Sequence, residues 1–376
     1  CSWVGSWAGS GYCSGRGARL SVARCRDQDD LVEEAKEAIV AAVEVLAGPV
    51  LEMTEVTPGP GIQNRHVRVR CDKETFLVKV SDGPLSVLEA ELVGLEALAA
   101  AARGTEIVVP LPHTLGEMPG RGCFLVMDFL HFIPFGPSIP KVLEKMGRGL
   151  AAIHTYPPPP SYRVSVPVDA GEGDRAAAKE EMQYGFQGQV TYLGTWPQDN
   201  AAEADFAEFF VERRLRPQLE SACLKFQHRY GTSNEDITAV SRLYDGVLKQ
   251  AAEVLQPVRA CPPSILHGDL WSGNTGATPE RRPILVDPAC WYGHAEFDLA
   301  ISRLFGRFAP IFYDAYFEVA PMAPGFEERQ RVYLLYHMLN QANLHGAGFG
   351  RGGTAEHPGG YLEQAIAAME RLAKGT

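Results

Sequence analysis

Several features that define common protein classes are missing from this 376-residue sequence. No stretch offers about 18 uninterrupted apolar residues, so we expect no transmembrane helix. The eight cysteines form no CxxC pair and no dense cluster, which predicts free thiols in a reducing, intracellular compartment rather than a disulfide framework or a zinc site. The formal net charge of −11 argues against nucleic acid or an anionic membrane as a partner.

Three common catalytic motifs are also absent. The sequence has no Gly-x-Ser-x-Gly elbow, no HExxH helix and no GxxxxGK[ST] loop, so serine hydrolase, zincin and P-loop chemistry have no support. What remains is an ordinary globular composition, with 45% hydrophobic and 22% charged residues. The length exceeds a typical single core and favours two domains or lobes.

The first 26 residues differ from the rest of the chain. They contain four arginines, several serines and glycines, and no Asp or Glu, which is typical of an organelle transit peptide for a plastid or mitochondrion. The alternatives are a disordered extension of a cytoplasmic protein or mistranslated upstream sequence. The first residue is Cys1 rather than Met, as in a fragment, a processed form or an incomplete gene product. We therefore expect residues 1–29 to be an extension outside the folded domains.

The first half of the folded part predicts strands and two helices. Apolar residues at helical spacing predict a helix over 31–46, and alternation predicts strands at 66–71 and 75–80. Ser86 and Glu89 have the spacing of a capping box that opens a helix to about residue 102. An apolar run at 123–130 is typical of a buried strand.

Helices dominate after residue 140. They are expected at 141–154, 202–222, 235–255, 295–306, 327–345 and 360–373, with two short strands at 264–266 and 283–286. Residues 157–182 are rich in Pro, Gly and charge and predict a loop insertion. We therefore predict an α+β fold with two lobes: a small lobe at 30–135, with an antiparallel sheet plus helix, and a larger, mostly helical lobe at 136–376.

The sharpest chemical signal is the segment from His267 to Asn274 followed by Asp287. An Asp (Asp269), an Asn five residues later and a second Asp at the end of a strand have the spacing of a kinase catalytic loop. The first Asp would accept the proton of the acceptor hydroxyl, while Asn274 and Asp287 supply hard oxygen ligands to Mg²⁺. A metallohydrolase site that uses His267 and His294 is the alternative, but it leaves Asn274 without a role.

The first lobe carries residues that would complement this loop. Lys79 lies in an alternating strand, where a lysine usually points to solvent, but Glu91 in the following helix would allow a Lys–Glu ion pair that orients it toward phosphates. Gly59 and Gly61 lie in a segment that would cover the phosphates. Because this segment lacks a third glycine, a plain turn is an equal alternative.

The motifs HGDLWSGN and DPACWYGHAEFDLA resemble the fructosamine-3-kinase and ketosamine-3-kinase family, whose relatives are the aminoglycoside and choline phosphotransferases. The resemblance extends over roughly residues 30–374. It implies a two-lobed protein-kinase-like fold and a kinase that uses ATP and Mg²⁺. It also implies phosphorylation of the sugar 3-hydroxyl of ketosamines, either small molecules or glycated proteins, which leads to deglycation and repair.

The resemblance also implies roles for individual residues. Asp269 would be the catalytic base, Asn274 and Asp287 the magnesium ligands, and Lys79, held by Glu91, the phosphate contact. The adenine hinge would comprise Met127, Asp128, Phe129 and Leu130, while the sugar would meet Trp271, His294 and Glu296. For these last three a structural role is the open alternative, and Asp298 is expected to cap a helix or support the catalytic loop.

The sequence departs from the family pattern in three places. The segment at 200–206 reads NAAEADF instead of a Trp-rich stretch, the insertion at 165–182 lengthens a loop, and Gly61 stands where some members have a redox-active cysteine. The first two leave the accepted ketosamine open. Two alternatives remain: a kinase of another small metabolite such as an aminoglycoside or choline, and a non-catalytic pseudokinase. A monomer and a homodimer are equally compatible with the sequence.

Overall fold

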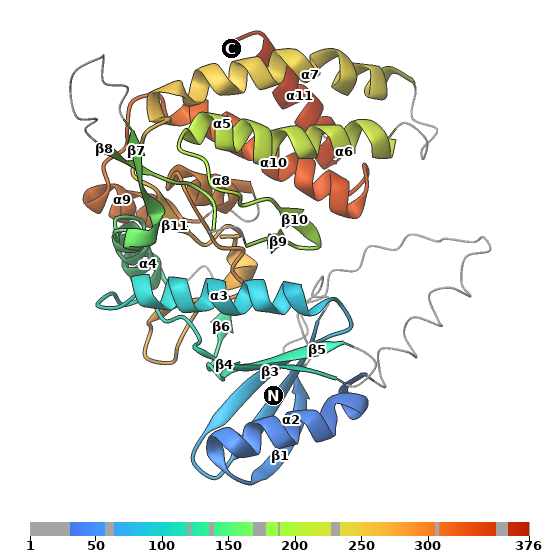
Figure 1. Cartoon of the computed structure of the whole chain (residues 1–376), viewed down its shortest axis with the longest axis vertical. Coiled ribbons are helices and arrows are strands. Elements are labelled where there is room, and N and C mark those ends of the chain that lie inside the picture. Colours follow the sequence, from blue (N-terminus) through green and yellow to red (C-terminus); the bar gives the residue numbers. More distant parts are fainter. Residues whose placement is uncertain are drawn as a thin grey trace. The chain divides into compact units, whose positions relative to one another are not determined.

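A computed structural model gives the fold, and it describes residues 31–56, 64–118, 122–134, 139–167, 178–186, 189–226, 234–304, 308–350 and 360–375 (Figure 1). The proposed extension at 1–29 and the two loop glycines, Gly59 and Gly61, lie outside these ranges. The chain divides into two compact units, Cys1–Gly83 with Gly116–Phe124, and Pro84–Leu115 with Leu125–Thr376. These units divide the chain elsewhere than the predicted lobes, whose boundary stays a prediction.

The first unit contains β1, β2 and β3 and only the adjoining ends of β5 and β4, in an antiparallel sheet with strand order β1-β2-β3-β5-β4. The strands of the sheet are β1 (Val50–Val56), β2 (Arg65–Cys71), β3 (Thr75–Ser81), β4 (Pro112–Glu117) and β5 (Cys123–Asp128). The chain returns to the first unit at the end of β4 and leaves it again within β5. Helix α2 (Leu31–Ala47) contacts β1, β2 and β3 and buries Ile39 and Val43. The predicted helix and alternating strands are confirmed here.

The second unit begins with α3 (Leu85–Ala101), whose start differs from the prediction. Pro84 is the N-cap and no side chain caps the helix. Ser86, the predicted cap, instead has its Oγ 3.1 Å from the hydroxyl of Tyr192. The capping box was therefore wrong, because Ser86 already lies inside the helix, one residue after its start.

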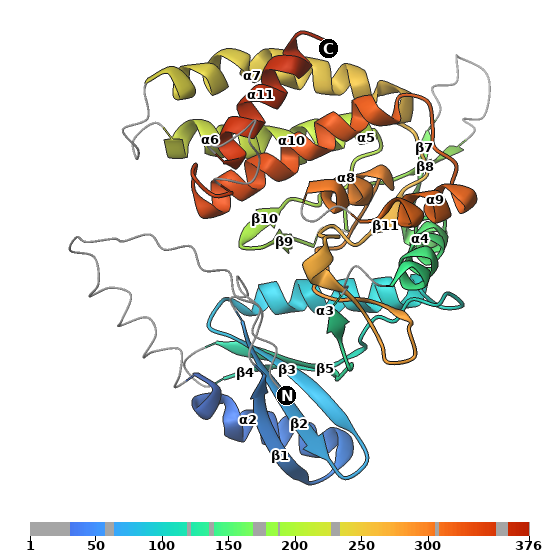
Figure 2. The same cartoon turned by 180° about the vertical axis from the view of Figure 1, so that it is seen from behind.

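Most of the second unit is helical (Figure 1 and Figure 2). Helix α10 packs against α6, α7, α8 and α11. Asp205 caps α5, accepting hydrogen bonds from the N–H groups of Ala207 and Glu208. The helices are α4 (Pro140–His154), α5 (Phe206–Phe210), a π-helical turn (Val211–Leu215), α6 (Arg216–Phe226), α7 (Asn234–Leu255), α8 (Glu296–Leu304), α9 (Pro310–Val319), α10 (Phe326–His345) and α11 (Tyr361–Ala373).

Short antiparallel strand pairs hold the loops of the second unit. Strand β11 (Ser264–Leu266) pairs with β14 (Trp291–Gly293), and β12 (Thr275–Ala277) pairs with both β13 (Pro283–Leu285) and β6 (Ile133–Pro134). Two hairpins complete the set: β7 (Arg163–Pro167) with β8 (Ala178–Met182), and β9 (Thr191–Leu193) with β10 (Trp196–Gln198). The prediction of a loop insertion at 157–182 was wrong for β7 and β8, which lie within that range and pair with each other.

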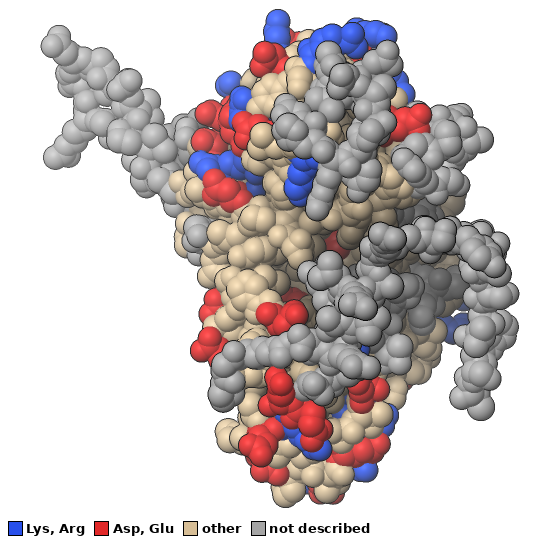
Figure 3. Space-filling model, turned by 90° about the vertical axis from the view of Figure 1, so that its right-hand side faces the viewer, with Lys and Arg blue, Asp and Glu red and all other residues tan. Residues whose placement is uncertain are grey.

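Two surface properties bear on partners. No helix among the described residues is long and apolar enough to cross a membrane. On the face shown in Figure 3, acidic and basic side chains are interspersed rather than gathered into one basic patch.

Candidate active site

The catalytic-loop motif forms a tight loop between β11 and β12. Asn274 closes it, because its Nδ2 donates to both the backbone oxygen and the carboxylate Oδ2 of Asp269, each at 2.9 Å. The backbone N–H of Trp271 donates to the Asp269 carbonyl, and that of Asn274 to the Trp271 carbonyl. The structure thus brings together the predicted base and the first predicted magnesium ligand.

Asp298 on α8 holds the start of this loop through hydrogen bonds to its backbone. Its fully buried carboxylate accepts the N–H of His267 at 2.7 Å and that of Gly268 at 2.9 Å. His154 Nε2 lies 3.2 Å from the same carboxylate, and His154 Nδ1 lies 2.8 Å from the hydroxyl of Tyr316. Burial opposes ionisation, but the hydrogen bond and charge of His154 outweigh it, so the pKa of Asp298 lies below its usual value.

Gly268 is required at its position by geometry. Its φ is +80°, and a Cβ there would lie 2.0 Å from the carbonyl oxygen of Ala289. Because an L-residue is disfavoured at this φ and the colliding atom is backbone, no other residue fits without moving the loop.

His267 has both ring nitrogens engaged with backbone. Nε2 lies 2.9 Å from the carbonyl of Val286, and Nδ1 accepts the N–H of Asp269 at 3.3 Å. Burial lowers the pKa of this imidazole, so it is neutral at physiological pH. This arrangement favours the structural role over the metal-ligand alternative.

Asp287 follows β13 in a left-handed backbone conformation, with φ of +54°. Such a conformation in a residue other than glycine stores strain and often marks a functional position. The Asp287 carboxylate is close enough to Asp269 for its charge to oppose ionisation of that residue. The structure therefore places the second predicted magnesium ligand beside the loop.

The donor set fits a nucleotide-bound magnesium ion rather than a protein-only metal site. The Nδ2 of Asn274 donates to Asp269, and the hard donors that a cation would use here are the amide oxygen of Asn274 and the carboxylate oxygens of Asp287. Within the described ranges, no three or more His, Cys, Asp or Glu side chains cluster as metal ligands. Mg²⁺ commonly takes one or two protein oxygens and completes its shell with phosphates and water.

Asp269 itself is held in a low-polarity position. Burial, helped by the charges of Asp287 and Asp298, raises its pKa to about 7, while hydrogen bonds from Asn274 and Trp271 oppose the rise. The Trp271 ring lies across Gly273, where a Cβ would meet it at 2.2 Å. Trp271 thus packs on its own loop and also bonds to the predicted base.

Lys79 and Glu91 are both buried, with 4% and 9% of their surface exposed. Lys79 lies on β3, where its cross-strand partner is His66, and Glu91 lies on α3. The expectation that Lys79 points to solvent as an ordinary strand lysine is thereby disfavoured. The ion pair between them stays a prediction, since they belong to different compact units.

The predicted hinge residues follow one another at the end of β5. Met127 is buried, while Phe129 and Leu130 are half-buried. The Asp128 carboxylate accepts the N–H of Leu111 at 3.0 Å and lies 2.7 Å from His113 Nε2. The side chain of Asp128 thus anchors the neighbouring strand, and any contact with adenine would fall to its backbone or to its neighbours.

His294 and Glu296 have structural partners. The Glu296 carboxylate receives two hydrogen bonds from the guanidinium of Arg329, at 2.8 and 2.6 Å, and His294 Nδ1 lies 2.8 Å from the hydroxyl of Tyr333. Burial and the nearby Arg329 charge lower the pKa of His294 to about 3. These contacts favour the structural alternative for Glu296, while the substrate role of His294 stays a prediction.

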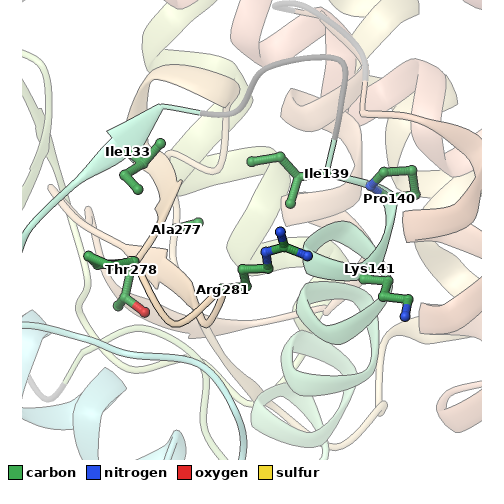
Figure 4. A pocket seen from close by; sticks show the side chains of 8 residues that line it. Ile133, Ile139, Pro140, Lys141, Ala277, Thr278 and Arg281 are labelled. Atoms are coloured by element: carbon green, nitrogen blue, oxygen red, sulfur yellow. The ribbon is translucent and has the colours of Figure 1, made fainter.

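A cavity of about 530 Å³ opens elsewhere in the second unit (Figure 4). Ile133 of β6, the start of α4 at 139–141 and the β12–β13 turn line it, and Lys141 and Arg281 lie on its walls. None of the predicted site residues that the structure describes is among the residues that line this cavity.

Sequence reasoning missed a buried polar network around Arg214. This residue is 1% exposed, lies in the π-helical turn, and stacks on the rings of Phe209 and Trp291. The available signal was Pro217, which cannot donate to the carbonyl of Arg213; Arg214 Nη1 donates to that oxygen instead, at 3.2 Å.

Known proteins resemble this chain over most of its length. Residues 36–356 match the family described as fructosamine kinase. The protein-ribulosamine 3-kinase, chloroplastic, of Oryza sativa subsp. indica is 35% identical over 80% of this chain and 77% of its own. The ketosamine-3-kinase of Mus musculus is 32% identical over 74% and 85%, respectively.

Solved structures agree. A putative fructosamine-3-kinase from Thermobifida fusca superimposes with a TM-score of 0.65 at 26% identity, covering 90% of this chain and 99% of that one. A thermostable mutant of an aminoglycoside phosphotransferase, in a complex with AMP-PNP and hygromycin B, reaches 0.55 at 13% identity over 90% and 100%, which shows the shared α+β kinase-like fold alone. On the match to the family over most of its length, the chain belongs to the fructosamine kinase family.

Proposed function

We propose that this protein is an ATP-dependent kinase that phosphorylates the sugar 3-hydroxyl of ketosamines, the adducts that sugars form with amines. Family membership and relatives named ribulosamine and ketosamine 3-kinases support this reaction. A phosphate at that position destabilises the adduct, so the outcome would be deglycation of the amine.

The hydrogen bond from Asn274 to the Asp269 carboxylate carries the proposal. This bond orients the buried carboxylate of Asp269, and the amide oxygen of Asn274 is the atom of that side chain that would bind a cation. Asp269 would accept the proton of the attacking hydroxyl, and its pKa near 7 suits a general base. Phosphoryl transfer asks chiefly for placement and charge neutralisation, which a loop held at this many points provides.

Asn274 and Asp287 would hold Mg²⁺, which neutralises phosphate charge when bound. Lys79, with Glu91, would contact the phosphates, and the segment with Gly59 and Gly61 would cover them. The hinge at 127–130 would lie beside adenine.

The acceptor class would include ribulosamines and related adducts on small molecules or protein lysines. The rice relative is named for protein ribulosamine and the mouse relative for ketosamine. The departures at 200–206 and 165–182 leave the preferred sugar to experiment.

The decisive measurement is ADP release with Mg·ATP and a panel of ribuloselysine, fructoselysine, an aminoglycoside and choline. Turnover confined to the ketosamines, abolished in Asp269→Asn, would support the proposal and rank the sugars. Turnover on the aminoglycoside or choline alone would refute the substrate class while keeping the kinase chemistry. No turnover on any acceptor would favour the pseudokinase alternative.

We propose plastid targeting as a separate point. The Arg- and Ser-rich residues 1–26 support it, together with the chloroplastic relatives from rice and Arabidopsis thaliana. Fusion of residues 1–30 to a fluorescent protein in plant cells tests it. Diffuse cytoplasmic fluorescence would refute it.

A further inference from the structure

The β9–β10 hairpin is tied to the helical core by one continuous chain of hydrogen bonds. Gln198 Nε2 donates to the Tyr336 hydroxyl at 2.8 Å, and Thr191 Oγ1 donates to Gln198 Oε1 at 3.0 Å. Asn200 Nδ2 donates to Thr191 Oγ1 at 2.8 Å, and Arg214 donates to the Asn200 side-chain oxygen. All five side chains are buried.

Arg214, at one end of this chain of hydrogen bonds, determines which group donates and which accepts in each of them. Arg214 has only donors, so each following group accepts on one side and donates on the other until Tyr336. Burial lowers the pKa of the Arg214 guanidinium to about 10, which leaves it charged at pH 7. A buried cation is costly unless its hydrogen bonds are satisfied, and the Nη1 and Nη2 atoms of Arg214 donate to this chain and to the carbonyls of Asp199 and Arg213, whereas its buried Nε has no partner among the described residues.

This chain of hydrogen bonds holds the hairpin at its open end, the end opposite the turn. Thr191 and Gln198 are cross-strand partners, so the network clamps both strands at the same register position. The hairpin carries two half-buried aromatic side chains, Tyr192 and Trp196. Tyr192 contacts Ser86 of α3, and the ammonium of Lys225 lies 5.7 Å from the Trp196 ring centroid.

The hairpin lies beside the catalytic loop. Figure 1 and Figure 2 both show β9 and β10 next to the orange segment that follows β11, which contains Asp269. The far end of the hydrogen-bond chain is also near that residue. Burial raises the pKa of Tyr336, and the charge of Asp269 adds to the rise, although Arg214 opposes it.

We propose that Gln198 and Tyr336 are positioning residues for the acceptor: their hydrogen bond fixes the β9–β10 hairpin as a wall of the acceptor site beside Asp269. The inference rests on the proposed kinase function and deepens it by naming the element that meets the sugar. Neither residue touches the reacting atoms, so loss of the bond displaces the acceptor and leaves the nucleotide in place.

The test is Tyr336→Phe, which removes the hydroxyl and keeps the ring. We expect the KM for ribuloselysine to rise about five- to tenfold, the factor that one lost hydrogen bond predicts, with the KM for ATP unchanged and kcat changed less. Gln198→Leu should give the same pattern. Because Gln198→Leu removes the bond to Tyr336 and also the acceptor of Thr191, the double variant should be no worse than Gln198→Leu alone.

The matched control is Tyr184→Phe. Its hydroxyl is also buried and donates to the Cys261 carbonyl at 2.5 Å, so a similar loss of stability is expected without an effect on the hairpin. If Tyr184→Phe raised the acceptor KM as much as Tyr336→Phe, the effect would be general destabilisation and the inference would fail.

Amide hydrogen exchange of residues 191–198 separates this inference from the proposed function. Faster exchange there in Tyr336→Phe, but not in Tyr184→Phe, would establish the tie even if the wild type phosphorylates no ketosamine, a result that would overturn the proposed function alone. Unchanged exchange together with an unchanged acceptor KM in an active enzyme would overturn the inference.

Discussion

Replacement of Asp298 by Asn is the sharpest test of how the catalytic loop is held. The carboxylate accepts the N–H groups of His267 and Gly268 with one oxygen each, and His154 approaches the same group. Asn keeps the size but offers one acceptor oxygen. Its amide NH₂ must then face one of the two backbone N–H donors, which stays buried and without a partner.

The structure sets the size of the effect. A hydrogen bond to a charged group contributes about 1.5–3 kcal/mol, and a buried donor without a partner costs about 1–3 kcal/mol. Allowing for relaxation, we expect Asp298→Asn to lower the free energy of unfolding by about 2–4 kcal/mol. Because Gly268 precedes Asp269 directly, a shift of the loop should also reduce kcat, on the order of 10- to 100-fold.

Urea unfolding followed by fluorescence, together with ADP release under saturating Mg·ATP and ketosamine, measures both quantities. Asp205→Asn is the matched control. Asp205 also accepts two backbone N–H groups, from Ala207 and Glu208, but at a half-exposed helix start where Asn caps equally well. Wild-type stability and turnover in Asp298→Asn would refute the reasoning.

Three further outcomes are expected. Asp269→Asn should lose turnover while its urea midpoint stays at or above that of wild type, because burial of the Asp269 charge opposes folding at neutral pH; near-wild-type kcat would remove Asp269 from the base role. Burial lowers the pKa of His294 and of His337 to about 3. Between pH 6.5 and 3 the unfolded state therefore binds more protons than the folded state, and the protein becomes less stable as the pH is lowered. Each should cost about 2 kcal/mol at pH 5 relative to pH 7.5, while the raised pKa of Asp269 offsets part of the total. The test is therefore a comparison of variants: between these pH values His337→Leu should lose about 2 kcal/mol less stability than wild type, and an equal loss in both would contradict this. Gly268→Ala should fold poorly or lose activity, because its Cβ meets the Ala289 carbonyl; an active, stable variant by circular dichroism and ADP release would show that the loop can move.

The sequence alone determined the elements whose signal is local. The helix at 31–46, the alternating strands on either side of residues 72–74 and the helices after residue 140 follow from periodicity, because one face of each must be apolar. The kinase interpretation also came from the sequence, since the spacing of Asp269, Asn274 and Asp287 is fixed along one loop and one strand.

Contacts between distant segments could be known only from the tertiary structure. Ser86 has the pattern of a cap, yet it lies inside the helix and meets Tyr192. Glu296 has the pattern of a substrate contact, yet a buried Arg329 from α10 pairs with it. Pro217 was a local signal of an irregular helix beside Arg214, but it does not predict which groups bury that side chain, because they come from the segment that follows β10 and from the rings of Phe209 and Trp291. Local spacing thus determined which groups could do chemistry, and long-range packing decided which of them are committed to holding the fold, because a buried polar group takes whichever partner the fold brings to it.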